Sequence, residues 1–158
     1  MDGIIFDVDG TLWDSVEVVA ESWNLAIKEN SDLEPDLNRE ILQGLFGKTM
    51  DEIAAGVFPD LDLNSRRKLM DICFDYENRY LETHPGVYYE GVMDTLKELA
   101  LEYPLFIVSN CQCGYIEVMM KGAGMEPYIK DFLCFGQTQT SKDLSLIHIS
   151  EPTRHLRI

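Results

Sequence analysis

Two aspartates follow directly on the first apolar stretch of the chain. Positions 4–6 read Ile-Ile-Phe, and Asp7 and Asp9 come next. An uninterrupted apolar run is typical of a strand that is buried on both faces, as in a parallel sheet. Because buried carboxylates are costly unless they are paired, hydrogen-bonded or bound to a metal, both should lie at the carboxyl end of this strand. That end is where open α/β sheets bind ligands, so the pair predicts a ligand-binding or metal-binding site.

The turn after the aspartates limits what kind of site this is. Gly10 lets the chain turn away closely, and the hydroxyl of Thr11 can fix the turn. A calcium-binding EF-hand loop needs a glycine at its sixth position and a bidentate glutamate later. Gly10 is the fourth residue counted from Asp7, so the segment is not an EF-hand.

The segment from Asp7 to Ser15, DVDGTLWDS, resembles the first motif of the haloacid dehalogenase-like (HAD) hydrolases, DxDGTLxDS. The resemblance implies that Asp7 is a nucleophile, which attacks phosphorus to give an aspartyl-phosphate. It implies that Asp9 is the general acid/base, which protonates the leaving oxygen and then activates water. An acid at position 9 also points to phosphatases and phosphomutases, because HAD dehalogenases lack an acid there and the transport ATPases carry threonine.

Polar residues also follow a second apolar run, at positions 105–108. Ser109 comes directly after it and matches the second HAD motif, a serine or threonine at a strand end. The resemblance implies that the hydroxyl of Ser109 and the following backbone N–H groups bind phosphate oxygens. Asn110 would supply a further donor, and Thr11 is assigned to the same phosphate-binding set. Taken alone, a Ser-Asn pair at a strand end is usually a turn.

Two lysines complete the candidate site. Lys142 follows the third expected strand and matches the third HAD motif, a lysine that screens the repulsion between Asp7 and the incoming phosphate. Lys48 ends the segment GLFGK at positions 44–48. This segment lies where the helical cap of the phosphoglycolate phosphatase and β-phosphoglucomutase branch faces its substrate. Lys48 either meets a substrate anion or is an ordinary exposed lysine at a helix end, and the sequence leaves both open.

The elements that must position these residues alternate between strands and helices. Apolar runs predict strands, and apolar residues at helical spacing predict helices. The expected core elements are strands at 4–6, 105–108 and 132–135, helices at 91–101 and 115–121, and a loop at 136–142. The order strand, helix, strand implies right-handed parallel crossovers and therefore the α/β fold class, with a Rossmann-like parallel sheet.

Between the first two motifs every expected element is a helix. The expected helices cover 15–30, 37–47, 49–57 and 64–83. Thr49 to Glu52 has the form of a capping box, and Asn64 is expected to cap the last helix. The expected inner face of that helix consists of Leu69, Ile72, Cys73, Tyr76 and Tyr80. This insertion resembles the HAD helical cap, which closes over the site, excludes water and selects the substrate.

We therefore expect residues 1–14 and 84–143 to form a HAD-like α/β core, with 15–83 as the inserted helical cap. The fourth HAD motif, an acidic GDxxxD loop that should follow Lys142 by a strand and a helix, is absent. Residues 144–158 instead begin with LSLIHISEPTR, which resembles the in-frame translation of a sequencing adaptor and is expected to be a non-native tail. The core would then be incomplete, and the chain would be an inactive and poorly stable fragment.

Composition excludes several classes of partner. A formal net charge of −15 argues against nucleic acid and anionic membrane surfaces. No apolar run approaches the length of a membrane span, and the first strand begins too early for a signal peptide. Three of the four cysteines, Cys111, Cys113 and Cys134, lie in the later part, and we expect structural, reduced thiols rather than a zinc site. The protein is expected to be a cytoplasmic monomer.

The resemblance implies a magnesium-dependent phosphatase that hydrolyses a small phosphorylated metabolite. Mg²⁺ would be held by a carboxylate oxygen of Asp7, the backbone carbonyl of Asp9, waters, the substrate phosphate and an acid of the missing motif. A sugar phosphomutase would use the same nucleophile and return the phosphoryl group to a sugar, and the sequence does not separate the two reactions. The third alternative is the inactive, truncated fragment.

Overall fold

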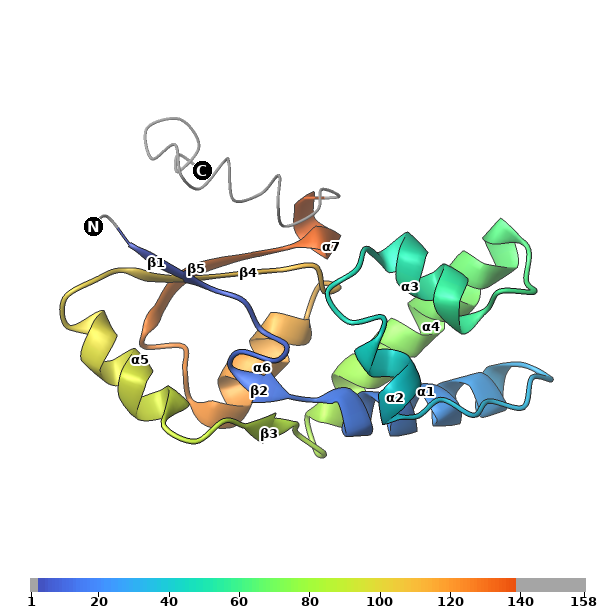
Figure 1. The fold of residues 1–158 in the computed structure, drawn as a ribbon, viewed down its shortest axis with the longest axis horizontal. Helices are drawn as coiled ribbons and strands as arrows, with labels where there is room; N and C mark the ends of the chain where they lie inside the picture. The colour runs from blue at the N-terminus through green and yellow to red at the C-terminus, as the bar shows by residue number, and fades with distance from the viewer. Residues whose placement is uncertain (1–2, 139–158) are drawn as a thin grey trace.

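The computed structural model describes residues 3–138 (Figure 1). The strands are β1 (Ile4–Phe6), β2 (Trp13–Asp14), β3 (Val87–Tyr88), β4 (Leu105–Ser109) and β5 (Ile129–Cys134). The helices are α1 (Val16–Asn30), α2 (Arg39–Gln43), α3 (Met50–Val57), α4 (Leu63–Leu81), α5 (Val92–Ala100), α6 (Tyr115–Ala123) and α7 (Phe135–Thr138). We call α1 to α4 the helical region, and β1, β4 and β5 with α5 and α6 the sheet region. The two regions lie side by side along the long axis in Figure 1.

The sheet region is built on parallel strands in the order β1–β4–β5. The ladder pairs Phe6 with Ile107, and it pairs Ser109 with Cys134. Helices α5 and α6 lie on one face of this sheet (Figure 1), so the α/β fold class expected from the sequence is confirmed. Parallel pairing brings the carboxyl ends of the strands to one edge, where Asp7 follows β1.

Strand β1 differs from the expectation that it is buried on both faces. Ile5 is 36% exposed, while Ile4 and Phe6 are half-buried and pack against the sheet-region core. The reason is alternation: side chains along a strand point to opposite faces, and α5 and α6 cover only one. Among residues 3–138, β1 also pairs with β4 alone and is therefore an edge of the sheet that the structure describes.

The end of β5 also differs from expectation. The strand begins earlier than predicted, at Ile129, and ends at Cys134, so Phe135 starts the short helix α7 instead of ending a strand. The charged residues Lys130 and Asp131 interrupt the apolar run in the sequence and conceal the first half of the strand. At its other end, the N–H of Cys134 donates to the side chain of Gln137 at 3.1 Å, which turns the chain into α7.

A short antiparallel pair lies at the point where the chain leaves and re-enters the sheet region. β2 pairs with β3 through Trp13 opposite Tyr88, and their ring centroids are 5.4 Å apart. Gly86 permits this contact, because a Cβ there would lie 2.9 Å from the carbonyl oxygen of Asp14. Strands of two residues carry no periodic pattern, so the sequence did not predict this pair.

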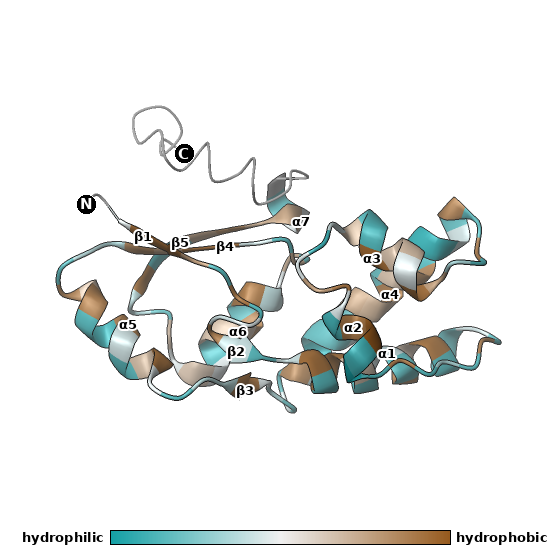
Figure 2. Ribbon diagram, in the orientation of Figure 1, coloured by the Kyte–Doolittle hydropathy of each residue, from teal (hydrophilic) through white to brown (hydrophobic). Residues whose placement is uncertain are grey.

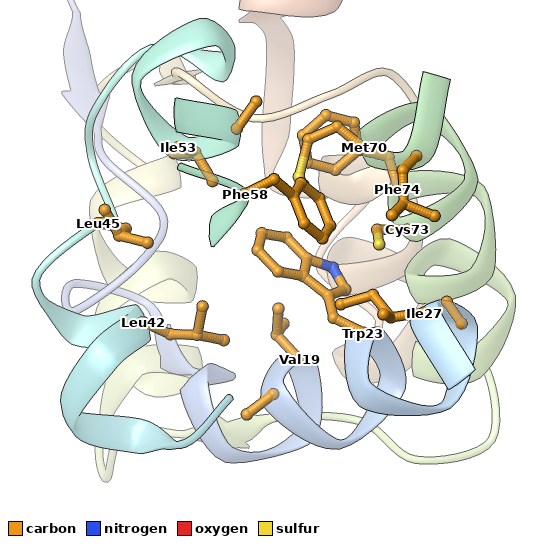
Figure 3. Packing of buried hydrophobic residues seen from close by; sticks show 14 of the residues in the cluster. Val19, Trp23, Ile27, Leu42, Leu45, Ile53, Phe58, Met70, Cys73 and Phe74 are labelled. Atoms are coloured by element: carbon orange, nitrogen blue, oxygen red, sulfur yellow. The ribbon is translucent and has the colours of Figure 1, made fainter. Parts of the chain in front are cut away.

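The core of the helical region surrounds Trp23. Figure 3 shows its indole ring facing Phe58, Met70 and Phe74, and the centroids of the Trp23 and Phe74 rings are 5.8 Å apart. Each helix from α1 to α4 carries both apolar and polar residues, which Figure 2 shows as brown and teal along the same ribbon. Such amphipathic helices bury their apolar sides against one another.

The helix boundaries test the expected caps. The capping box of Thr49 and Glu52 is present at the start of α3, as predicted. The expected cap at Asn64 is wrong: the carboxylate of Asp62 accepts from the N–H groups of Asn64 and Ser65, so the cap lies two residues earlier and α4 begins at Leu63. The second helix is shorter than expected, because Asn38 caps it and it ends at Gln43.

The buried face of α4 is rotated from the expected one. Its buried residues are Leu69, Met70, Cys73, Phe74, Glu77 and Leu81, while the expected inner residues Ile72, Tyr76 and Tyr80 are only half-buried. The sequence pattern predicted the wrong face because Glu77 is an acidic residue, which is normally expected on the solvent side of a helix. In the structure Glu77 lies on the buried side. No helix among residues 3–138 has the length and apolar character needed to cross a membrane.

Candidate active site

The carboxyl ends of β1 and β4 open into a cavity of about 430 Å³ between the two regions. Five of the residues that the sequence singled out line it: Asp7, Asp9, Lys48, Ser109 and Asn110. The strand pairing explains why Asp7 and Ser109 lie at the same end of the sheet. Phe6 lies opposite Ile107, and the two strands continue from there to Asp7 and to Ser109. Lys142 lies outside the described residues.

Asp9 has the most elaborate surroundings of these residues. The hydroxyl of Tyr115 donates to its Oδ1 at 2.5 Å, and the hydroxyl of Ser15 lies 3.2 Å from the same oxygen. The Tyr115 and Ser15 hydroxyls are themselves 2.7 Å apart. Removal of water raises the pKa of Asp9 to about 6, although the bonds from Tyr115 and Ser15 oppose the rise. The carboxyl group can therefore both release and accept a proton near neutral pH.

Asp7 is half-buried, and its carboxylate lines the cavity. The N–H of Val8 donates to Oδ1 of Asp7 at 2.9 Å, which fixes the carboxylate beside the turn. The turn is closed by backbone bonds, because the N–H groups of Thr11 and Leu12 donate to the Val8 carbonyl at 3.1 and 2.9 Å. Gly10 has a φ of +75°, so the turn requires the conformational freedom of glycine there.

Thr11 is exposed and is not among the cavity-lining residues. The structure therefore separates it from the other residues that the sequence assigned to phosphate binding. Its observed contribution is the backbone N–H that closes the turn after Asp9.

Ser109 and Asn110 are both buried at the end of β4. The hydroxyl of Ser109 accepts from the N–H of Cys111 at 3.3 Å. The side-chain amide of Asn110 donates to the carbonyl of Gly47 at 2.8 Å. Asn110 thus links the sheet region to the loop before α3, and it holds the residue next to the exposed Lys48 at the cavity.

Glu77 is a cavity residue that the sequence did not identify as part of the site. It comes from α4, is 3% exposed, and accepts from the indole N–H of Trp23 at 2.5 Å through Oε2. Burial raises the pKa of Glu77 to about 8, with bonds to Gln112 and Trp23 opposing the rise. A signal was present: Glu77 follows Cys73 by four residues and precedes Leu81 by four, so it lies on an apolar stripe.

Tyr115 and Arg39 are two further cavity residues that the sequence did not identify as part of the site. Tyr115 begins α6 and reaches Asp9 only through the fold, so no local pattern could have indicated it. Arg39, at the start of α2, forms an ion pair with Asp14, the aspartate of the first motif that follows Trp13. The hydrogen bond from Arg39 lowers the pKa of Asp14, and both residues line the cavity.

The donors at the cavity are suited to magnesium. Mg²⁺ prefers oxygen ligands and keeps several waters, and the Asp7 carboxylate and Asp9 backbone carbonyl supply such oxygens. Within residues 3–138 no group of three or more His, Cys, Asp and Glu side chains is arranged to hold a metal ion.

Several solved structures are similar to this chain in fold. A predicted phosphoglycolate phosphatase from Haemophilus somnus is similar in structure, with a TM-score of 0.74 and 23% identity over 87% of this chain and 63% of that one. A haloacid dehalogenase-like hydrolase from Bacteroides fragilis has a TM-score of 0.74 and 14% identity, over 93% of this chain and 72% of that one. A HAD hydrolase from Bacillus subtilis, bound to magnesium, has a TM-score of 0.62 and 22% identity, over 96% and 74%.

These likenesses show the fold, and the chain spans less than two thirds of the length of the Haemophilus somnus protein. No curated protein matches the chain. The model of the haloacid dehalogenase-like hydrolase family matches residues 4–148, which include the first three motif positions and extend beyond Asp143. The chain therefore belongs to the haloacid dehalogenase-like hydrolase family.

Proposed function

We propose that the protein is a magnesium-dependent phosphatase that hydrolyses a small phosphorylated metabolite through an aspartyl-phosphate on Asp7. The observation that carries the proposal is the pair of carboxyl groups at the cavity. Asp7 lies at the end of β1, and Asp9, two residues later, has a pKa of about 6. A group with this pKa can act as a general acid and then as a general base at neutral pH.

In the first step a carboxylate oxygen of Asp7 attacks phosphorus, and the bond from phosphorus to the leaving oxygen breaks. Protonated Asp9 gives its proton to that oxygen, so the product leaves as an alcohol. In the second step Asp9 takes a proton from water, which attacks phosphorus and releases inorganic phosphate. Asp7 is then a carboxylate again, and Asp9 is again protonated.

Neighbouring groups support these steps. Tyr115 and Ser15 hold Asp9 in one orientation through bonds to a single oxygen, Oδ1. We assign Ser109, with the N–H groups that follow it, to binding of the transferred phosphoryl group. Bound Mg²⁺ would be held by the Asp7 carboxylate and the Asp9 carbonyl and would neutralise charge on the phosphate. The role of Lys142 in screening the same charge remains part of the proposal.

We further propose that residues 15–83 act as a cap that selects the substrate and that the rest of residues 1–143 forms the catalytic core. The helical region supplies two basic side chains, Lys48 and Arg39, and one acidic side chain, Glu77, to the cavity wall. Lys48 and Arg39 would attract the anionic part of a metabolite. The net charge of −15 disfavours nucleic acid and anionic lipid as partners and supports a small-molecule substrate for a cytoplasmic monomer.

The test is hydrolysis of an aryl phosphate by the purified chain in magnesium, compared with Asp7→Asn. The amide cannot act as the attacking carboxylate, so we expect Asp7→Asn to release no phosphate above background. Asp32→Asn is the matched control, because Asp32 is exposed in the loop after α1. Equal turnover by Asp7→Asn and the unchanged chain would contradict the nucleophile. A folded but wholly inactive chain would favour the fragment alternative.

A further inference from the structure

Three of the four cysteines meet where β4 and β5 end. Cys111 and Cys113 follow β4, and Cys134 is the last residue of β5, directly opposite Ser109 in the ladder. The loop after β4 is also bonded to the chain beyond β5, because the N–H of Gly136 donates to the Cys111 carbonyl at 3.3 Å. All four cysteines of the chain lie among the described residues and are thiols.

Cys134 is the centre of this thiol cluster. Its side chain makes hydrogen bonds with the thiols of both Cys111 and Cys113. Gly136 packs closely against Cys113. A Cβ at position 136 would lie 2.7 Å from Sγ of Cys113 and 2.5 Å from its backbone nitrogen. Only a glycine at position 136 leaves room for the Cys113 side chain beside the end of β5.

The three thiols differ in access to solvent. Cys134 and Cys111 are 2% and 7% exposed, whereas Cys113 is exposed. Cys113 is therefore the member of the cluster that lies at the surface. Cys73, the fourth cysteine, lies apart in the core of the helical region, where burial raises its pKa to about 12.

The three thiols also differ in acidity. Hydrogen bonds from Cys111, from the N–H of Gln137 and from Cys113 lower the pKa of Cys134 to about 6, and desolvation only partly opposes them. Desolvation raises the pKa of Cys111 and of Cys113. Because the thiolate and not the thiol is the nucleophile, Cys134 is the member of the cluster whose sulfur is most readily ionised to a nucleophile.

We propose that the thiol cluster is an oxidation site in which a peroxide joins Cys134 to Cys113 in a reversible disulfide. The Cys134 thiolate attacks one oxygen of hydrogen peroxide, the O–O bond breaks, and hydroxide leaves with a proton as water. The sulfur of Cys113 then attacks the Cys134 sulfenic acid, the S–O bond breaks, and a second water leaves. Two thiols lose two electrons and two protons, and the peroxide is reduced to two waters.

The disulfide would bind the loop after β4 covalently to the end of β5. That loop follows directly on Ser109 and Asn110, and the Cys113 carbonyl accepts from the side chain of Asn78 on α4 at 2.8 Å. Oxidation would thus lock the segment that connects the cavity edge to the helical region. The proposal does not depend on the phosphatase chemistry, and its test uses no activity.

The test is peptide mapping of the folded chain after treatment with hydrogen peroxide and alkylation of the remaining thiols. Lys121 and Lys130 separate Cys134 from the other two cysteines, so trypsin yields a linked pair of peptides if the disulfide forms. We expect loss of two of the four thiols, a linked peptide containing Cys134 and Cys113, and full recovery with dithiothreitol.

Variants decide which sulfur atoms are joined. Cys134→Ser and Cys113→Ser should abolish the linked peptide, whereas Cys111→Ser and the distant control Cys73→Ser should retain it. A chain that keeps all its thiols in peroxide, or a disulfide from Cys134 to Cys111, would overturn the proposal. Where a variant fails to fold, fragmentation of the linked peptide from the unchanged chain decides between the two partners, because Cys111 and Cys113 share one tryptic peptide and only the unlinked one carries the alkyl group.

Discussion

The helical region and the sheet region bury their side chains in different ways. The core of the helical region gathers residues from Val16 to Phe74, which the chain supplies in one continuous segment. The core of the sheet region joins Val8 and Leu12 to residues as distant as Met125 and Cys134. The first can form from amphipathic helices that are neighbours in sequence, while the second depends on pairing between distant strands. The cavity lies where the two cores meet.

The candidate chemistry is located at the boundary between the two cores. Asp9 belongs to the sheet region and Glu77 to the helical region, yet both line the cavity, and burial raises the pKa of each. Asp9 is bonded to Tyr115 at the start of α6, whereas Glu77 is bonded to Trp23 in the helical region and to Gln112 in the loop after β4. We therefore expect changes at Asp9 to affect chemistry and changes around Glu77 to affect folding.

The largest expected effect concerns Asp9. In a chain with measurable turnover, Asp9→Asn should slow hydrolysis of an aryl phosphate by about a hundred- to ten-thousand-fold, because general acid/base help is lost. Steady-state kinetics measure the loss, and urea unfolding should show little change in stability. A large loss of stability with unchanged turnover would mean that Asp9 is structural.

Trp23→Ala should have the largest effect on folding in the helical region. Trp23 is 2% exposed and donates to Glu77, so truncation leaves a cavity and removes one of the hydrogen bonds of the buried acid. We expect the free energy of unfolding in urea to fall by about 3–5 kcal/mol. Leu63→Ala is the control, because Leu63 is 54% exposed, and it should change stability by less than about 0.5 kcal/mol.

The caps and the strands show how far sequence could predict the fold. The run before Asp7, the Gly-Thr turn and the capping box at Thr49 are local patterns, and each predicted its element correctly. Asp62 was missed as a cap because Asn64 and Asp62 are both good capping residues and only the backbone decides between them. Tyr115 was missed because its partner Asp9 is 106 residues away.

Glu77 should make stability depend on pH. Its pKa is raised from 4.5 to about 8 in the folded chain, so the folded state binds the proton more tightly than the unfolded state. Between these pH values the unfolded chain loses the proton first, and stability should fall as pH rises, by at most about 1.4 kcal/mol per pH unit.

Glu77→Gln tests whether Glu77 causes stability to fall as pH rises. The amide has no proton to lose, so its stability should be flatter between pH 4.5 and 8 than that of the unchanged chain, as followed by urea unfolding. A wild-type stability that increases over this range, with no change in slope in the variant, would show that Glu77 is ionised in the folded protein.

The smallest expected effect concerns the bond between the two regions. Asn110→Ala removes the amide that donates to the Gly47 carbonyl, and should lower the free energy of unfolding by about 0.5–1.5 kcal/mol. Asn110→Asp should cost at least as much, because it turns an acceptor toward that carbonyl. If both variants are as stable as the unchanged chain, the bond does not join the regions in solution.

The central claim is that Asp7 carries the phosphoryl group, and the most direct measurement is to trap that intermediate. The chain is mixed with an aryl phosphate and magnesium, quenched in acid and reduced with borohydride, which converts an aspartyl-phosphate to homoserine. Peptide sequencing by mass spectrometry then reads positions 7 and 9 separately. The account predicts homoserine at position 7 and unchanged aspartate at position 9. Release of phosphate with homoserine at position 9, or at neither position, would contradict it.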